Sequence, residues 1–129
     1  MVDSEPPTRY IGLDIHKAYF VAIGVNAAQE QVFGPQRVDN RRLEAWLHTQ
    51  LTPQDAVVIE MTTNTYHFYD ALVPHVHSVI VVHPPHVALV PRAQVKTDRK
   101  AALALAQLHA GGLLTGVWMP PQPIRDLRA

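Results

Sequence analysis

"RYIGLDIHKAYFVAIGVN", residues 9–26, contains two runs rich in β-branched and aromatic residues, separated by little more than Lys17. Such runs with a short polar break are typical of two antiparallel strands joined by a tight turn. Asp14 lies inside the first run, between Leu13 and Ile15. Aspartate is disfavoured in strand interiors and costly to bury without a partner. The position of this acid therefore requires an explanation, structural or chemical.

The segments after residue 26 contain the remaining expected strands and helices. A third short run at 30–34, "EQVFG", continues the antiparallel meander. Compact apolar runs at 55–60 and 77–83 are typical of buried parallel strands. Helical patterns cover residues 39–51, 64–76 and 98–110, and a shorter one begins at the prolines of 84–93.

Side-chain spacing predicts the buried faces of the first two helices. Asp39 or Asn40 can cap the first helix, and Pro74 ends the second. The apolar face of the first helix consists of Leu43, Trp46, Leu47 and Leu51. In the second helix the expected face consists of Tyr66, Tyr69, Leu72 and Val73.

The order of three strands, helix, strand, helix, strand and helix predicts an α/β fold. Its mixed sheet should combine a three-stranded antiparallel meander with two parallel strands, and helices should cover both faces. Residues 1–8 are expected to be a flexible lead-in and 9–112 the folded domain. Residues 113–129 are expected to lead towards a missing C-terminal domain, because "IRDLRA" breaks off as a helical pattern begins.

Composition limits the classes of function. The 129 residues suffice for one domain, and the formal net charge is zero, so nucleic-acid binding would need local basic patches. The absence of cysteine excludes a disulfide framework and thiolate metal sites, and it suits a reducing cytoplasm. No apolar segment is long enough to serve as a signal peptide or to span a bilayer.

Three acids lie where chemistry is expected. Asp14 is in the first strand, Glu60 ends the buried run "AVVIE", and Asp98 opens the last helix. Active sites of open α/β sheets collect at the carboxyl ends of strands, so these carboxylates should converge. Clustered carboxylates repel one another unless a cation such as Mg²⁺ binds between them. Two such ions can activate a water and stabilise a leaving oxygen in phosphodiester cleavage.

Each acid also has a plainer interpretation. Asp98 is a favoured residue for a helix N-cap. Asp14 can be a structural acid paired with Lys17 or Arg9, and Glu60 can be a surface acid at a strand end. The joint placement of the three acids favours the metal site over these separate explanations.

The motifs "YIGLDIHK", "VVIEMT", "VKTDRKAALALAQLHAGGL" and "IRDLR" occur in this order over about residues 9–128. Together they resemble the N-terminal domain of DEDD transposases of the insertion-sequence 110 family, relatives of the Piv DNA invertase. The resemblance implies an RNase H-like fold of the RuvC type and four acids that bind Mg²⁺ or Mn²⁺. It also implies DNA and a structured guide RNA as partners, a C-terminal domain with a serine nucleophile, a homo-oligomer, and a bacterial, nucleoid-associated location.

Position by position, the resemblance assigns the first three acids to Asp14, Glu60 and Asp98. The fourth should follow the third by three residues, where this chain has Ala101. That spacing places both side chains on one helix face, and alanine offers no ligand atom. Whether the alanine is natural or introduced, we expect weakened metal binding and impaired strand cleavage. The alternative function is a non-catalytic module for nucleic-acid binding and dimerisation.

The basic residues nearest these acids are the candidates for contacts with phosphates. They are Lys17, Arg92, Lys96, Arg99 and Lys100. A solvated, basic helix start is the alternative for the last four. His16 is the histidine nearest the expected site, and a zinc site is disfavoured because neither cysteine nor an H-E-x-x-H helix accompanies the eight histidines. A sugar-kinase-like ATP domain is also disfavoured, since no Gly-rich loop follows the first strand.

Overall fold

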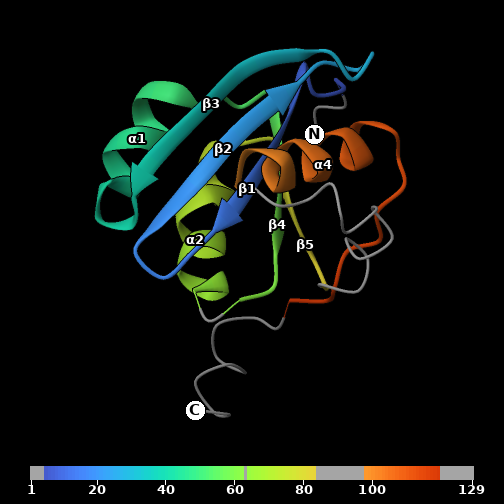
Figure 1. Ribbon diagram of the computed structural model, residues 1–129. Helices are drawn as coiled ribbons and strands as arrows, with labels where there is room; N and C mark the ends of the chain where they lie inside the picture. Colours follow the sequence, from blue (N-terminus) through green and yellow to red (C-terminus); the bar gives the residue numbers. More distant parts are fainter. Residues whose placement is uncertain (1–4, 63, 84–97, 120–129) are drawn as a thin grey trace.

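A computed structural model of the chain describes residues 5–62, 64–83 and 98–119 (Figure 1). The strands are β1 (Arg9–Ile15), β2 (Tyr19–Val25), β3 (Gln31–Asp39), β4 (Asp55–Glu60) and β5 (Ser78–Val82). The helices are α1 (Leu43–Gln50), α2 (Thr65–Leu72) and α4 (Asp98–Ala110), with 3₁₀ turns η1 (Asn40–Arg42) and η2 (Val73–His75). The expected short helix at 84–93 and the helical start at Ile124 lie outside these residues.

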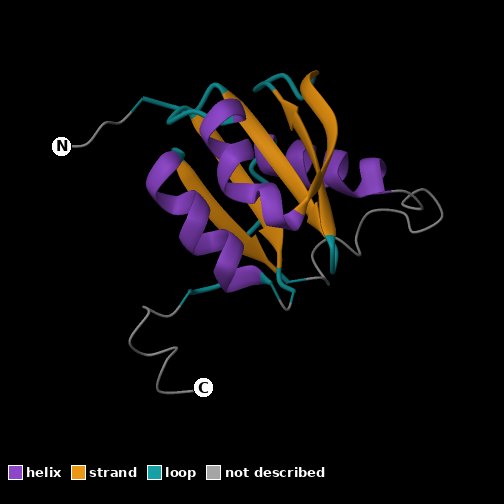
Figure 2. Ribbon diagram, turned by 90° about the vertical axis from the view of Figure 1, so that its left-hand side faces the viewer, coloured by secondary structure: helices purple, strands orange, loops and turns teal. Residues whose placement is uncertain are grey.

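The five strands form one mixed sheet in the order β3-β2-β1-β4-β5. β1 is central, and it pairs antiparallel with β2 and parallel with β4, which in turn pairs parallel with β5. Helices α1 and α2 cover one face of the sheet and α4 covers the other (Figures 1 and 2). The α/β fold with a three-stranded meander, two parallel strands and helices on both faces is confirmed.

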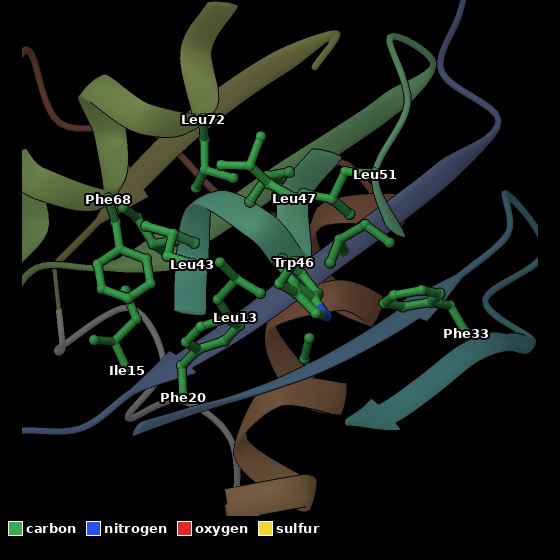
Figure 3. Packing of buried hydrophobic residues seen from close by; sticks show 14 of the residues in the cluster. Leu13, Ile15, Phe20, Phe33, Leu43, Trp46, Leu47, Leu51, Phe68 and Leu72 are labelled. Atoms are coloured by element: carbon green, nitrogen blue, oxygen red, sulfur yellow. The ribbon is translucent and has the colours of Figure 1, made fainter. Parts of the chain in front are cut away.

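The larger part of the core lies between the sheet and α1 and α2. Alternate residues of the strands, such as Leu13 of β1, point into it and belong to the same cluster as Leu47 of α1 (Figure 3). The Phe20 ring lies 5.0 Å from that of Trp46 and 5.3 Å from that of Phe68, both edge to face. The expected apolar face of the first helix is thus confirmed, and Asp39 caps the turn before it by accepting a hydrogen bond from the Arg41 backbone.

The opposite face of the sheet is covered closely by α4. Its small residues Ala102 and Ala106 are fully buried, and Leu105 packs on Val58. Gly12 of β1 lies beneath them, where an added Cβ would collide with the backbone of Ala102 and Ala106. The glycine and the alanines therefore let helix and strand approach one another, so α4 lies directly on the central strand.

Helix α2 confirms the prediction for Leu72, which is buried, and for Tyr69, which is partly buried against the core, but the prediction was wrong for Tyr66 and Val73. Its buried residues are Thr65, Phe68 and Leu72, whereas Tyr66 and Val73 are 41% and 43% exposed. Both sets have helical spacing, but Phe68 is the buried residue because its ring packs edge to face against Phe20 in the core.

The third strand was predicted too short, because it continues beyond 30–34 to Asp39. Pro35 lies inside it. Among the described strands, β3 pairs only with β2 and forms an edge of the sheet, where the missing N–H of a proline is tolerated.

A buried ion pair joins the first residues of β1 and β4. Arg9 donates from Nε to Oδ1 of Asp55 at 2.7 Å and from Nη2 to Oδ2 at 2.8 Å. Asp55 also accepts from the Thr52 backbone at 2.8 Å and is fully buried, whereas the Arg9 side chain is 24% exposed. This pair fixes the ends of the two central strands in register.

Candidate active site

Asp14 and Glu60 occupy neighbouring positions on the two central strands. Leu13 pairs with Ile59, and one residue further along this parallel register Asp14 lies beside Glu60. Leu13 and Ile59 point into the core under α1 and α2, so the two acids point to the face covered by α4. The structure therefore brings together two of the acids that the sequence singled out, at the carboxyl ends of β1 and β4.

The two carboxylates affect one another. The pKa of Glu60 is raised above its ordinary value, first by burial and second by the negative charge of Asp14. Both side chains are partly buried, and Asp14 is only 15% exposed. Oxygen donors that repel one another in a partly desolvated position suit a hard divalent cation such as Mg²⁺ or Mn²⁺ better than zinc.

A column of planar groups adjoins Asp14. His16 Nε2 lies 2.6 Å from Asp14 Oδ2, and the His16 ring stacks on Tyr19 with centroids 4.7 Å apart and 18° between planes. The guanidinium of Arg37 lies 3.7 Å from the centroid of the same Tyr19 ring. Sequence reasoning noted His16 and missed Tyr19 and Arg37, because the turn between β1 and β2 brings Tyr19 here and the pairing of β2 with β3 brings Arg37.

The third acid opens the helix that covers this face. α4 begins at Asp98, as expected, and Ala101 follows within its first turn. Side-chain placement of Asp98 is outside the described part of the structure, so its convergence with Asp14 and Glu60 stays a prediction. Within the described part, no three histidine, aspartate or glutamate side chains form a group able to hold a metal.

Comparison with known proteins identifies the family. The sequence family of the IS110-type DEDD transposases, described as "Transposase", matches residues 11–129 of the chain. The chain belongs to this transposase family. A 52-residue segment is also 40% identical to a protein of Sinorhizobium fredii (strain NBRC 101917 / NGR234) named "Putative transposase y4qE". That alignment covers 40% of this chain and 13% of the relative, so the chain spans a small part of that protein.

The basic residues expected to contact nucleic acid fall into three groups in this transposase domain. Lys17 is exposed in the turn between β1 and β2. Arg99 and Lys100 are exposed in the first turn of α4 and line a cavity of about 320 Å³ together with Ile23, Gln31, Pro35 and Leu103. Arg92 and Lys96 lie outside the described residues. No described helix has the length and apolar character needed to cross a membrane.

Proposed function

We propose that this transposase domain cleaves and transfers DNA strands with divalent metal ions held by Asp14, Glu60 and Asp98. The observation that carries the proposal is the side-by-side placement of Asp14 and Glu60 on the α4 face, at the carboxyl ends of two central strands. When bound, the ions would activate the attacking oxygen and stabilise the leaving oxygen at phosphorus.

The roles of the protein groups follow from their placement. Asp14 and Glu60 would offer carboxylate oxygens, and the hydrogen bond to His16 holds Asp14 in one orientation. The rigid β1–β4 pairing keeps the separation of the two acids fixed. Asp98 would approach from α4, which packs on the same face. A guide RNA and a serine-bearing C-terminal domain, as the family resemblance implies, belong to this proposal as partners.

Ala101 is the feature that weakens this centre. We expect the chain to bind Mn²⁺ weakly and Ala101→Asp to bind it more tightly, because the new carboxylate lies three residues from Asp98 on the same helix face. Titration of Mn²⁺ followed by electron paramagnetic resonance measures the affinity. Ala104→Asp is the matched control, since it adds the same charge one turn further from Asp98.

The outcomes separate the two functions under consideration. Tighter binding by Ala101→Asp, lost again when Asp14→Asn is added, supports a metal-dependent nuclease. Equal affinities for the unchanged chain, Ala101→Asp and Ala104→Asp would remove the argument. In that case the non-catalytic nucleic-acid-binding module, which the missing ligand at Ala101 favours, becomes the better description.

A further inference from the structure

Arg37 lies in line with the acid pair on the sheet. Val21 of β2 pairs with Asp14 on one side and with Arg37 of β3 on the other. Val21 packs against Ala102 of α4, so this row of residues faces α4. Two strand spacings of about 4.8 Å place the Arg37 backbone roughly 10 Å from that of Asp14. Arg37 therefore lies two strands from Asp14 on the same face of the sheet, with Val21 between them.

The structure holds this cation in place without neutralising it. Its guanidinium rests on the Tyr19 ring, and Tyr19 in turn stacks on His16. Among the described residues no ion pair involves Arg37, whereas Arg9 and Arg41 are paired with Asp55 and Asp39. An exposed, preoriented guanidinium keeps its donors available for phosphate oxygens, and it loses less side-chain entropy when it binds them.

The cavity lined by Arg99 and Lys100 continues this positive surface. Its wall includes Ile23, which lies two residues beyond Val21 along β2, about 7 Å away at the usual rise of a strand. Gln31 and Pro35 of β3 close the cavity on the same side as Arg37. Arg37 of β3 and the pair Arg99 and Lys100 of α4 therefore lie along one stretch of the sheet face that α4 covers, the face to which Asp14 and Glu60 also point.

We propose that Arg37, together with Arg99 and Lys100, forms a track that holds the phosphate backbone of a DNA strand as it approaches Asp14 and Glu60. The inference rests on the proposed function, because that function makes DNA the expected nucleic acid. It adds β3 to the nucleic-acid surface and assigns Tyr19 the task of orienting Arg37. The contacts are to phosphates, so they carry no sequence preference.

Binding of fluorescently labelled DNA, followed by anisotropy in EDTA over a range of salt concentrations, tests the track without any metal or cleavage. We expect Arg37→Gln to weaken binding several-fold. It should also reduce the slope of log affinity against log salt by about 0.7 for a single strand or about 0.9 for a duplex. Arg42→Gln is the matched control, since it removes the same charge from an exposed residue of η1, which leads into α1 on the other face.

Tyr19 provides a second, independent variant. Tyr19→Phe keeps a ring beneath the guanidinium and should bind DNA like the unchanged chain, whereas Tyr19→Leu should lose part of the affinity. Equal effects of Arg37→Gln and Arg42→Gln would overturn the track, as would a lowered melting temperature of Arg37→Gln with unchanged DNA affinity. A preference for an RNA strand of the same sequence, with the Arg37 effect confined to RNA, would overturn the choice of DNA. None of these results bears on Mn²⁺ binding by the acids, which tests the proposed function separately.

Discussion

The Arg9–Asp55 pair should respond unequally to removal of its two members. Asp55 is fully buried, while the Arg9 side chain is 24% exposed. Arg9→Met leaves a carboxylate in the interior, where the Thr52 backbone is the only donor to it that remains among the described residues. Asp55→Asn leaves a guanidinium that can reach water, and the amide oxygen can still accept from Arg9 and Thr52. The arginine substitution should therefore cost more.

The size of the difference follows from the contacts. Arg9→Met removes both hydrogen bonds to the carboxylate, at 2.7 and 2.8 Å, and one at 3.0 Å to the Gln50 carbonyl. Breaking a buried pair so that one charge remains costs about 3–5 kcal/mol, and we expect Arg9→Met to fall in this range. Asp55→Asn keeps one oxygen to accept from Arg9 Nη2 and the Thr52 backbone but loses the bond from Arg9 Nε, because the amide nitrogen cannot accept it. Since the freed Arg9 group can reach water, we expect about 1–2 kcal/mol.

Urea unfolding monitored by circular dichroism measures both changes. With an m-value of about 2 kcal/mol/M, Arg9→Met should lower the midpoint by about 1.5–2.5 M and Asp55→Asn by about 0.5–1 M. The double variant Arg9→Met with Asp55→Leu should recover much of the loss, because it leaves no buried charge. If Asp55→Asn costs as much as Arg9→Met, or the double variant is less stable than either single one, the reasoning from unequal burial is wrong.

Three further outcomes follow from single positions. Gly12→Ala should lower the free energy of unfolding by about 1–3 kcal/mol, because its Cβ would meet the backbone of α4. Gly112→Ala, where an added Cβ has nothing within 4 Å, is the comparison in urea titration, and a smaller loss for Gly12→Ala than for Gly112→Ala would contradict this. Since the folded pKa of Glu60 is raised above 4.5, the folded state holds more protons than the unfolded one above that pH. The stability of the chain relative to Glu60→Gln should therefore fall as pH rises from 4 to 7, which paired unfolding curves would reveal. Burial, aided by the nearby His77, lowers the pKa of His109 below 6.5, so stability relative to His109→Phe should fall as pH drops below 6.5; thermal melts that differ equally at every pH would exclude this.

Much of this fold could be predicted because local patterns and pairing rules agree. The apolar runs around Asp14 and before Glu60 indicated strands, and short connections limited how the first three could pair. The apolar positions from Leu43 to Leu51 matched the buried face of α1. Placing Asp14 near Glu60 followed from the carboxyl-end rule for strands, and the pairing of Leu13 with Ile59 together with the effect of Asp14 on the pKa of Glu60 agrees with it.

The remaining features depend on choices that periodicity does not make. Tyr66 and Phe68 both belong to helical apolar patterns, and contact with Phe20 decided between them. The third strand was predicted to end at Gly34, although an edge strand can accommodate Pro35 and continue. The contact of Arg37 with Tyr19 depends on the register between β2 and β3, which shifts near Gly24. A sequence fixes such a register through the whole sheet and not through a local motif.

Arg37, Val21, Asp14 and Glu60 lie in one row across the sheet, so the effect of an inserted residue depends on whether it falls within a strand or in a loop. An added residue in a connecting loop leaves the row intact, since the strands keep their alignment. An added residue within β1, before Asp14, reverses the direction of every side chain that follows it. With the insertion before Leu13, Asp14 would point into the hydrophobic core and Leu13 would take its place. The length of the central strand should therefore be under far tighter restraint than the length of the loops beside it.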